Sequence, residues 1–188
     1  MYKNFKIFDT LAHPTVNGKW LRELNGETFE DFSKKMHDYN LIGACVVGLP
    51  GIGGYSHEKF YKLSIQYNNM YPVAALTGSN IDEMIKEINI IYEIGFKFIK
   101  IHPRLLKYDF KEDELSRIFI HCQNLNIIIF YCTYYFSKIN IFPSKDPYWT
   151  LVNSLKNAPD LKIVLLHGGG VRILEYSELC RHNKNILL

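Results

Sequence analysis

Short apolar runs alternate along the chain with stretches whose apolar residues recur at helical spacing. Each apolar run ends at turn residues, which is the pattern of strands buried on both faces of a sheet. The predicted strands cover residues 5–9, 41–47, 71–76, 98–101, 127–131, 162–166 and 186–188. The helical pattern falls between successive runs, at residues 27–39, 57–69, 79–94, 112–123, 147–157 and 172–182.

This alternation repeats about every 30 residues, as in βαβ units. Two architectures fit it, an open doubly wound sheet and a (β/α)8 barrel. The sequence contains strand–helix units up to a seventh strand, whereas a complete barrel typically takes about 250 residues. We therefore predict one α/β domain over residues 1–188. We expect it to be of the (β/α)8 TIM-barrel type, truncated after the seventh strand, with the open sheet as the alternative.

Composition narrows the class of protein. Of the 188 residues, 47% are hydrophobic and 22% are charged, which is ordinary for a folded domain. A net charge of +3 without a basic run predicts no nucleic-acid partner. No apolar stretch is long enough to cross a membrane, so no membrane partner is expected. The four cysteines (Cys45, Cys122, Cys132 and Cys180) form no CxxC pair, which favours free thiols in a cytoplasmic protein.

Three of the apolar runs lead into a histidine: His13, His102 and His167. In parallel sheets and barrels, ligands bind at the carboxyl ends of the strands. Strand residues alternate in direction, so Lys100 should share a face with His102, and Asp9 a face with His13. We expect all five side chains to converge on one mouth. Each has a structural alternative, since Asp9 could cap its loop and Lys100 could reach solvent, but recurrence on three strands favours a shared polar site.

Three sequence stretches resemble one known family. They are Ile-Phe-Asp-Thr-Leu-Ala-His-Pro (7–14), Gly-Phe-Lys-Phe-Ile-Lys-Ile-His-Pro (95–103) and Ile-Val-Leu-Leu-His-Gly-Gly (163–169). Together they resemble the amidohydrolase superfamily, in the branch related to aminocarboxymuconate semialdehyde decarboxylase. The resemblance implies a (β/α)8 barrel with a divalent metal, often zinc, at its mouth. It makes His13 a metal ligand and places His167 near the metal or as a base.

The chain departs from that family at ligand positions. Leu11 stands where the motif Asp-x-His-x-His has its first histidine, and Tyr131 with Cys132 ends strand five where a histidine is expected. A standard zinc site needs three or more protein ligands. The resemblance therefore implies a metal cofactor with an incomplete ligand set, and a protein without metal is the alternative.

The expected function is a hydrolase, decarboxylase or lactonase acting on a small polar or carboxylated substrate at the barrel mouth. We expect His167 and Asp9 to be catalytic, because an imidazole titrates near neutrality and suits a general base. Lys100, His102, Arg104 and Tyr131 are the expected substrate-binding residues. The alternative is an inactive, ligand-binding descendant.

A third hypothesis takes the glycine-rich stretch 48–54 as a phosphate loop, although it lacks the Walker lysine. The open edge of the seventh strand also suggests a homo-oligomer.

Overall fold

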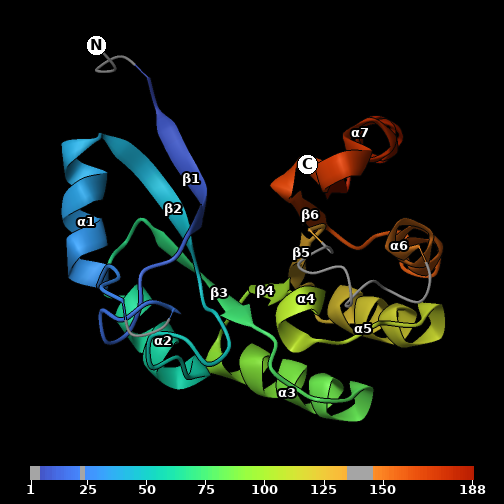
Figure 1. The fold of residues 1–188 in the computed structure, drawn as a ribbon, viewed down its shortest axis with the longest axis horizontal. Helices are drawn as coiled ribbons and strands as arrows, with labels where there is room; N and C mark the ends of the chain where they lie inside the picture. Colours follow the sequence, from blue (N-terminus) through green and yellow to red (C-terminus); the bar gives the residue numbers. More distant parts are fainter. Residues whose placement is uncertain (1–4, 22–23, 135–145) are drawn as a thin grey trace. The chain divides into compact units, whose positions relative to one another are not determined.

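The computed structural model describes residues 5–21, 24–134 and 146–188, in which strands and helices alternate (Figure 1). The chain forms two compact units. The first contains the residues up to Ala75 together with Ile94–Phe96. The second contains Leu76–Glu93 and the chain from Lys97 onward. Two compact units can belong to one domain, so the single domain over residues 1–188 stays a prediction.

The first unit is a three-stranded parallel sheet with two helices. Strand β2 pairs with β1 and with β3, in parallel in both cases. Its elements are β1 (Ile7–Ala12), α1 (Phe29–Asp38), β2 (Leu41–Val47), α2 (His57–Ser64) and β3 (Met70–Ala75).

The second unit carries four parallel strands in the order β4, β5, β6, β7. Its elements are α3 (Ile81–Ile94, whose last residue belongs to the first unit), β4 (Phe98–Ile101), α4 (Pro103–Leu106), α5 (Glu112–Asn124), β5 (Ile128–Cys132), α6 (Pro147–Lys156), β6 (Ile163–Leu166), the 3-10 turn η3 (His167–Arg172), α7 (Ile173–His182) and β7 (Ile186–Leu187). The predicted α/β class with parallel strands is confirmed, and the predicted elements form with small shifts of their ends.

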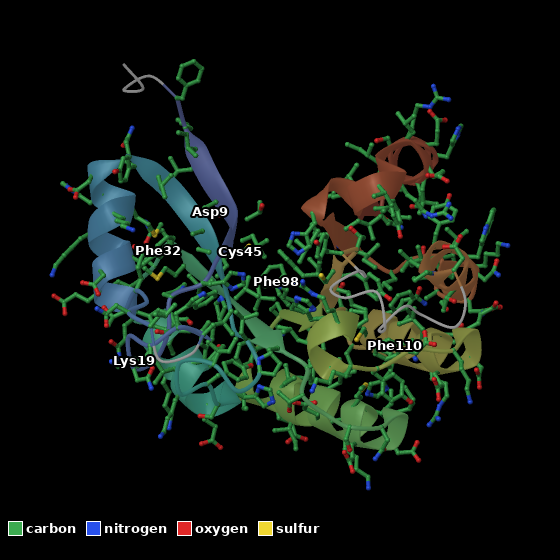
Figure 2. All side chains as sticks on the ribbon, in the orientation of Figure 1. Asp9, Lys19, Phe32, Cys45, Phe98 and Phe110 are labelled. Atoms are coloured by element: carbon green, nitrogen blue, oxygen red, sulfur yellow. The ribbon has the colours of Figure 1, made fainter. Side chains whose placement is uncertain are left out.

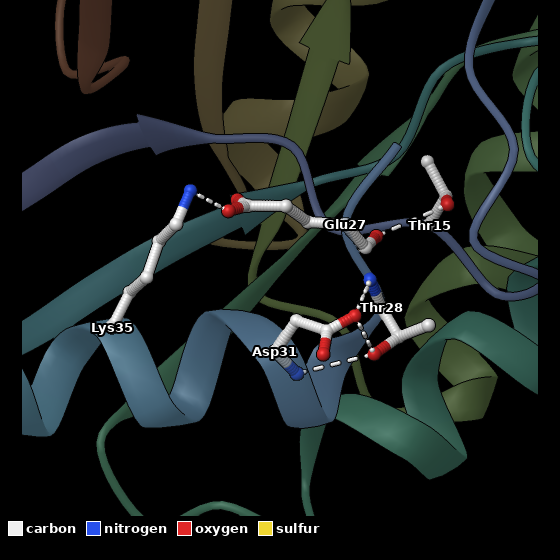
Figure 3. A network of polar contacts seen from close by, with 5 residues as sticks. All are labelled: Thr15, Glu27, Thr28, Asp31 and Lys35. Carbon is white, nitrogen blue, oxygen red and sulfur yellow. Dashed lines mark hydrogen bonds and ion pairs between the residues drawn. The ribbon is translucent and has the colours of Figure 1, made fainter. Parts of the chain in front are cut away.

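Local capping explains where α1 begins. Thr28 Oγ1 accepts the N–H of Asp31 at 3.1 Å, and the Asp31 carboxylate accepts the N–H of Thr28 at 3.2 Å (Figure 3). This reciprocal capping box satisfies two N–H groups that the first helical turn leaves unpaired. The side chain of the neighbouring Glu27 forms an ion pair with Lys35 of α1. The backbone carbonyl of Glu27 accepts the N–H of Thr15 at 2.7 Å. The loop between β1 and α1 is thereby tied to the helix.

The start of α3 differs from the prediction. The sequence favoured a capping box between Ser79 and Asp82. In the structure Asn80 Oδ1 caps the helix by accepting the N–H of Glu83 at 3.0 Å. The Glu83 carboxylate in turn accepts the N–H of Ser79 at 3.0 Å. Asn is as good an N-cap as Ser, so two adjacent capping residues left the choice to the tertiary structure.

A buried carboxylate on α3 anchors the loop that follows β3. Glu87 accepts the N–H groups of Thr77 and Gly78 at 2.8–3.0 Å, and also the Thr77 hydroxyl. We expect Glu87→Gln to lower the free energy of unfolding by about 1.5–3 kcal/mol, because an amide nitrogen then faces backbone donors. Glu83→Gln on the exposed turn is the matched control and should change it by less than about 0.5 kcal/mol. Urea denaturation measures both, and equal losses would contradict the expectation.

The two faces of the second unit's sheet have different neighbours. Lys100 pairs in register with Phe130, and Phe130 with Val164, so these three side chains share one face. The rings of Phe98 and Phe130 meet on that face, with centroids 5.9 Å apart. Ile101, Tyr131 and Leu165 share the opposite face, where the Tyr131 ring contacts Phe119 of α5 at 6.2 Å. Lys100 therefore lies on the face that α5 does not cover.

Candidate functional site

The candidate site lies in the second unit, where β4, β5 and β6 end. Lys100 is the last but one residue of β4, His102 is the N-cap of α4, and Arg104 lies within α4. Tyr134 follows β5, and His167 follows β6. These are the carboxyl ends of neighbouring parallel strands, where barrels bind their ligands.

Lys100 is a buried amine. Its side chain lies on the face of the sheet that α5 does not cover, and the residue is only 3% exposed. Burial lowers the pKa of Lys100 to about 8; Cys132 opposes this shift, and the positive charge of Arg104 adds to it by a smaller amount. Among the described residues no carboxylate forms an ion pair with it. A lysine in this setting supplies a neutral amine near physiological pH, which an exposed lysine does not.

His102 is a buried imidazole held by the helix that follows it. It caps α4, and its Nδ1 accepts the N–H of Leu105 at 3.3 Å. Burial, followed by the charges of Lys100, Arg104 and His167, lowers the pKa of His102 to about 3. The ring is therefore neutral over the whole physiological range. The short helix α4, whose N-terminus His102 caps, lies in a stretch that was predicted as a loop.

Arg104 adds a fixed positive charge beside these groups. Its guanidinium lies over the ring of Tyr134, 4.7 Å from the centroid. Its Nε is buried and finds no acceptor among the described residues. A buried guanidinium N–H without an acceptor suits a ligand oxygen, and a carboxylate matches the guanidinium geometry. Tyr134, which the prediction did not include among the site residues, is the side chain that holds Arg104 in place.

His167 reaches the site from a turn, not from the strand. Its backbone has a φ of 67°, in the left-handed region, so the alternation of β6 stops at Leu166. Its exposed ring lies 6.3 Å from that of Tyr134. Burial, Lys100 and Arg104 together lower the pKa of His167, which keeps the imidazole neutral and able to accept a proton near pH 7. Strand alternation alone would place His167 on the same face as Leu165. In the structure Leu165 lies on the face of the sheet next to α5, and His167 lies in the turn that follows the strand.

Of the two residues that end β5, Cys132 borders the group and Tyr131 does not. Cys132 ends β5, and its thiol contacts the carbonyl of Tyr134 at 3.8 Å. Burial raises the pKa of Cys132, so the sulfur keeps its proton despite the nearby Lys100 and Arg104. The Tyr131 ring packs against Phe119 on the other face of the sheet. The ring of Tyr131 is thus not in the cluster formed by Lys100, His102, Arg104 and His167.

Asp9 and His13 belong to the first unit, where each has a local partner. The Asp9 carboxylate accepts the N–H of Leu11 at 2.9 Å, the loop-capping role that its position on β1 also allowed. Asp9 and Cys45 lie on the neighbouring strands β1 and β2 (Figure 2). His13 Nδ1 donates to the carbonyl of Val47 at 2.8 Å, which leaves the lone pair on Nε2. The site described above is built from the second unit alone.

The residues do not fit a standard metal site. Within residues 5–21, 24–134 and 146–188, no group of three or more His, Cys, Asp or Glu side chains is placed to hold a metal ion. Leu11 offers no lone pair, and Cys132 holds its proton. The expected ligand His13 is therefore without companions of the right kind in the described part of the chain.

The four cysteines are free, as predicted, and three of them are buried.

In the described residues, no helix has the length and apolar character that a membrane span requires.

Comparisons with known proteins identify the fold. No family model matches the sequence, and no curated protein matches it. Among solved structures, an uncharacterised TIM-barrel protein from Bordetella bronchiseptica aligns with a TM-score of 0.74 at 17% identity, covering 97% of this chain and 74% of that one. N-acetylneuraminate lyase from Proteus mirabilis aligns with a TM-score of 0.57 at 16% identity, covering 94% and 61%. The 4-hydroxy-tetrahydrodipicolinate synthase from Methylacidiphilum fumariolicum aligns with a TM-score of 0.56 at 15% identity, covering 94% and 58%.

These neighbours confirm the predicted (β/α)8 TIM-barrel type, of which the chain spans about three fifths to three quarters. They correct the family. The predicted amidohydrolase membership, and the predicted hydrolase, decarboxylase or lactonase function with it, was wrong: the neighbours include several dihydrodipicolinate synthases and N-acetylneuraminate lyases. The physical reason is that polar residues at strand ends occur wherever a barrel binds a ligand, so they indicate the fold more strongly than one family.

Proposed function

We propose that this chain carries the imine-forming site of a carbon–carbon lyase that acts on small carboxylated carbonyl compounds. The observation that carries the proposal is Lys100, a buried amine at the carboxyl end of a barrel strand with Arg104 and two imidazoles around it. Lysines that form Schiff bases are activated by desolvation or by a neighbouring cation, and Lys100 has both.

The names of structural neighbours support the substrate class. N-acetylneuraminate lyase, 4-hydroxy-tetrahydrodipicolinate synthase, and a probable 2-pyrone-4,6-dicarboxylic acid hydrolase from Acinetobacter baumannii with citric acid bound all refer to carboxylates. In this chain Arg104 has a buried N–H without an acceptor among the described residues. A substrate carboxylate at Arg104 would satisfy this donor and bring an adjacent carbonyl group toward Lys100.

The residues can then perform the reaction as follows. The neutral amine of Lys100 attacks the carbonyl carbon, and the electron pair of the C=O bond moves to oxygen. The nitrogen loses one proton when the C–N bond forms and a second when this bond becomes C=N. His167 carries each proton to the oxygen, which leaves as water. The imine nitrogen takes up a proton, and the bond between the carbon next to C=N and the following hydroxyl-bearing carbon breaks. Its electron pair forms an enamine C=C bond as the C=N pair moves to nitrogen, and the hydroxyl of the departing fragment loses its proton to become a carbonyl. The enamine carbon then takes up a proton, which regenerates the C=N bond. Water then restores the amine and releases the product.

The pH dependence of imine trapping tests the proposal. We expect pyruvate, the smallest 2-oxo acid, to form an adduct that sodium borohydride fixes on the peptide containing Lys100. The trapping rate should rise about tenfold per pH unit up to a break near pH 8 and then level off, because only the neutral amine reacts and the pKa of Lys100 is about 8. An ordinary lysine would keep gaining reactivity to about pH 10.

Arg104→Gln is the matched variant for this profile. Arg104 lowers the pKa of Lys100, so its removal should move the break to higher pH and weaken trapping of pyruvate more than that of uncharged acetone. Mass spectrometry of the reduced protein measures both effects. Labelling of other lysines at the same rate, or a rate that climbs unbroken to pH 10, would contradict the proposal.

Three earlier expectations remain to be measured. Imine formation at Lys100 requires no metal, so we expect trapping to survive EDTA, and a loss restored by zinc would support the metal expectation. A cytoplasmic location is supported by the four free thiols. The predicted homo-oligomer is tested by light scattering of the purified protein.

A further inference from the structure

The tautomer of His102 is set by the backbone. Leu105 can only donate its N–H, so His102 Nδ1, 3.3 Å away, must be the acceptor. The single proton of the neutral ring therefore lies on Nε2. Pro103 at the first position of α4 holds the turn in which this bond forms.

The charges around His102 prevent a second proton from binding. Lys100 and Arg104 act on the ring as positive charges, as does His167 when it is protonated, Cys132 beside them is an uncharged thiol, and the ring itself is 5% exposed. An imidazolium at this place would be a buried cation among cations. His102 is thus a neutral donor whose protonation does not change between about pH 5 and pH 9, since its pKa is about 3.

The position of His102 relates this donor to the reacting amine. His102 directly follows β4, one residue beyond Ile101, and its near-extended backbone (φ −125°, ψ 82°) keeps it on the side of Lys100. When the amine of Lys100 attacks a carbonyl carbon, negative charge develops on the carbonyl oxygen. A preorganised donor in a water-poor site is the usual means of stabilising such an oxygen.

We infer that His102 is a further catalytic residue, whose neutral imidazole donates a hydrogen bond from Nε2 to the substrate oxygen as Lys100 attacks. The inference rests on the proposed imine function. It assigns a hydrogen bond and no proton transfer, because proton movement belongs to His167, whose exposed ring exchanges with solvent. It also explains why an imidazole stands here: the ring offers an acceptor to the helix and a donor to the substrate at once.

Two substitutions separate the donor from the cap. His102→Asn keeps an oxygen that can accept the N–H of Leu105, since Asn is a good N-cap, but removes the Nε2 donor. We expect its melting temperature to stay close to wild type and its rate of pyruvate trapping on Lys100 to fall about 10²–10³-fold. His102→Gln places an amide N–H near the position of Nε2, and we expect it to trap faster than His102→Asn. The break of the pH profile should move only slightly, because neutral His102 carries no charge.

Nitrogen NMR of the ¹⁵N-histidine-labelled protein gives an independent readout. We expect the His102 ring to show the Nε2–H tautomer and no titration between pH 5 and pH 9. The Nδ1–H tautomer, a titration within this range, or trapping by His102→Asn at the wild-type rate would each overturn the inference while leaving imine formation intact. Absence of any adduct on wild-type Lys100 would overturn the proposed function and this inference together.

Discussion

Lys100→Met should abolish imine trapping and lyase activity, with a loss of about 10³-fold or more, because it removes the amine that attacks the carbonyl carbon. Lys97→Met is the matched control. Lys97 is exposed, and its ammonium lies over the Tyr92 ring at 5.1 Å, so its loss should leave trapping unchanged. Borohydride trapping followed by peptide mapping measures both variants. Full trapping in Lys100→Met would remove Lys100 from the mechanism.

The same substitution should make the protein more stable at neutral pH. The lowered pKa of Lys100 means that the unfolded chain binds a proton which the folded chain binds less tightly. Between about pH 8 and pH 10 the folded chain has already lost the Lys100 proton, whereas the unfolded chain still holds it. The free energy of unfolding therefore rises with pH in this range. A methionine carries no such cost, so we expect a gain of about 1–3 kcal/mol at pH 7 that shrinks at pH 10. Urea denaturation at both pH values tests this, and a loss of stability at pH 7 would contradict the burial of a costly charge.

Gly169→Ala should be more destabilising than Gly168→Ala in the turn after β6. Gly169 has a φ of 72°, and an added Cβ would lie 2.4 Å from Cδ2 of Tyr176 on α7. Tyr176 is fully buried and meets the Tyr148 ring edge to face, with centroids 5.1 Å apart, so it has little room to move. Backbone strain of about 1–2 kcal/mol and overpacking of about 1–3 kcal/mol should add to a loss of about 2–5 kcal/mol.

Gly168→Ala separates the two contributions. Gly168 has a φ of 58°, but its nearest neighbour for an added Cβ is Ile173 Cδ1 at 4.0 Å. We expect only the strain, about 1–2 kcal/mol. Urea denaturation of the two variants gives the difference, which measures the clash with Tyr176. Equal losses would mean that Tyr176 yields without cost, and the turn would then owe its shape to the glycines' conformational freedom alone.

The turn also shows why the family prediction failed. The stretch His167–Gly170 looked like a strand end holding a catalytic imidazole, as in the amidohydrolase resemblance. In the structure all four residues have positive φ values, of 67°, 58°, 72° and 56°. Alternation along β6 therefore says nothing about where His167 points. The three glycines were visible in the sequence, but a non-glycine residue at positive φ was not, because it depends on the packing that offsets its cost.

Local and periodic features were determined by the sequence alone. Buried parallel strands need continuous apolar runs, and helices need apolar residues at a helical period, so the order of elements and the barrel type followed from patterns a few residues long. The opposite faces of Lys100 and Ile101 on β4 have the same kind of cause, since alternation is a property of any strand.

The chemistry was decided by tertiary structure. Burial of Lys100, the bond that sets the tautomer of His102, and the stacking of Tyr134 on Arg104 depend on residues brought together from β4, β5 and β6. The placement of the Tyr131 ring against Phe119 depends on the register of β5, which the sequence left open between Phe130 and Tyr131. A pKa or a tautomer follows from the local dielectric and from nearby charges in space, and no spacing along the chain records these.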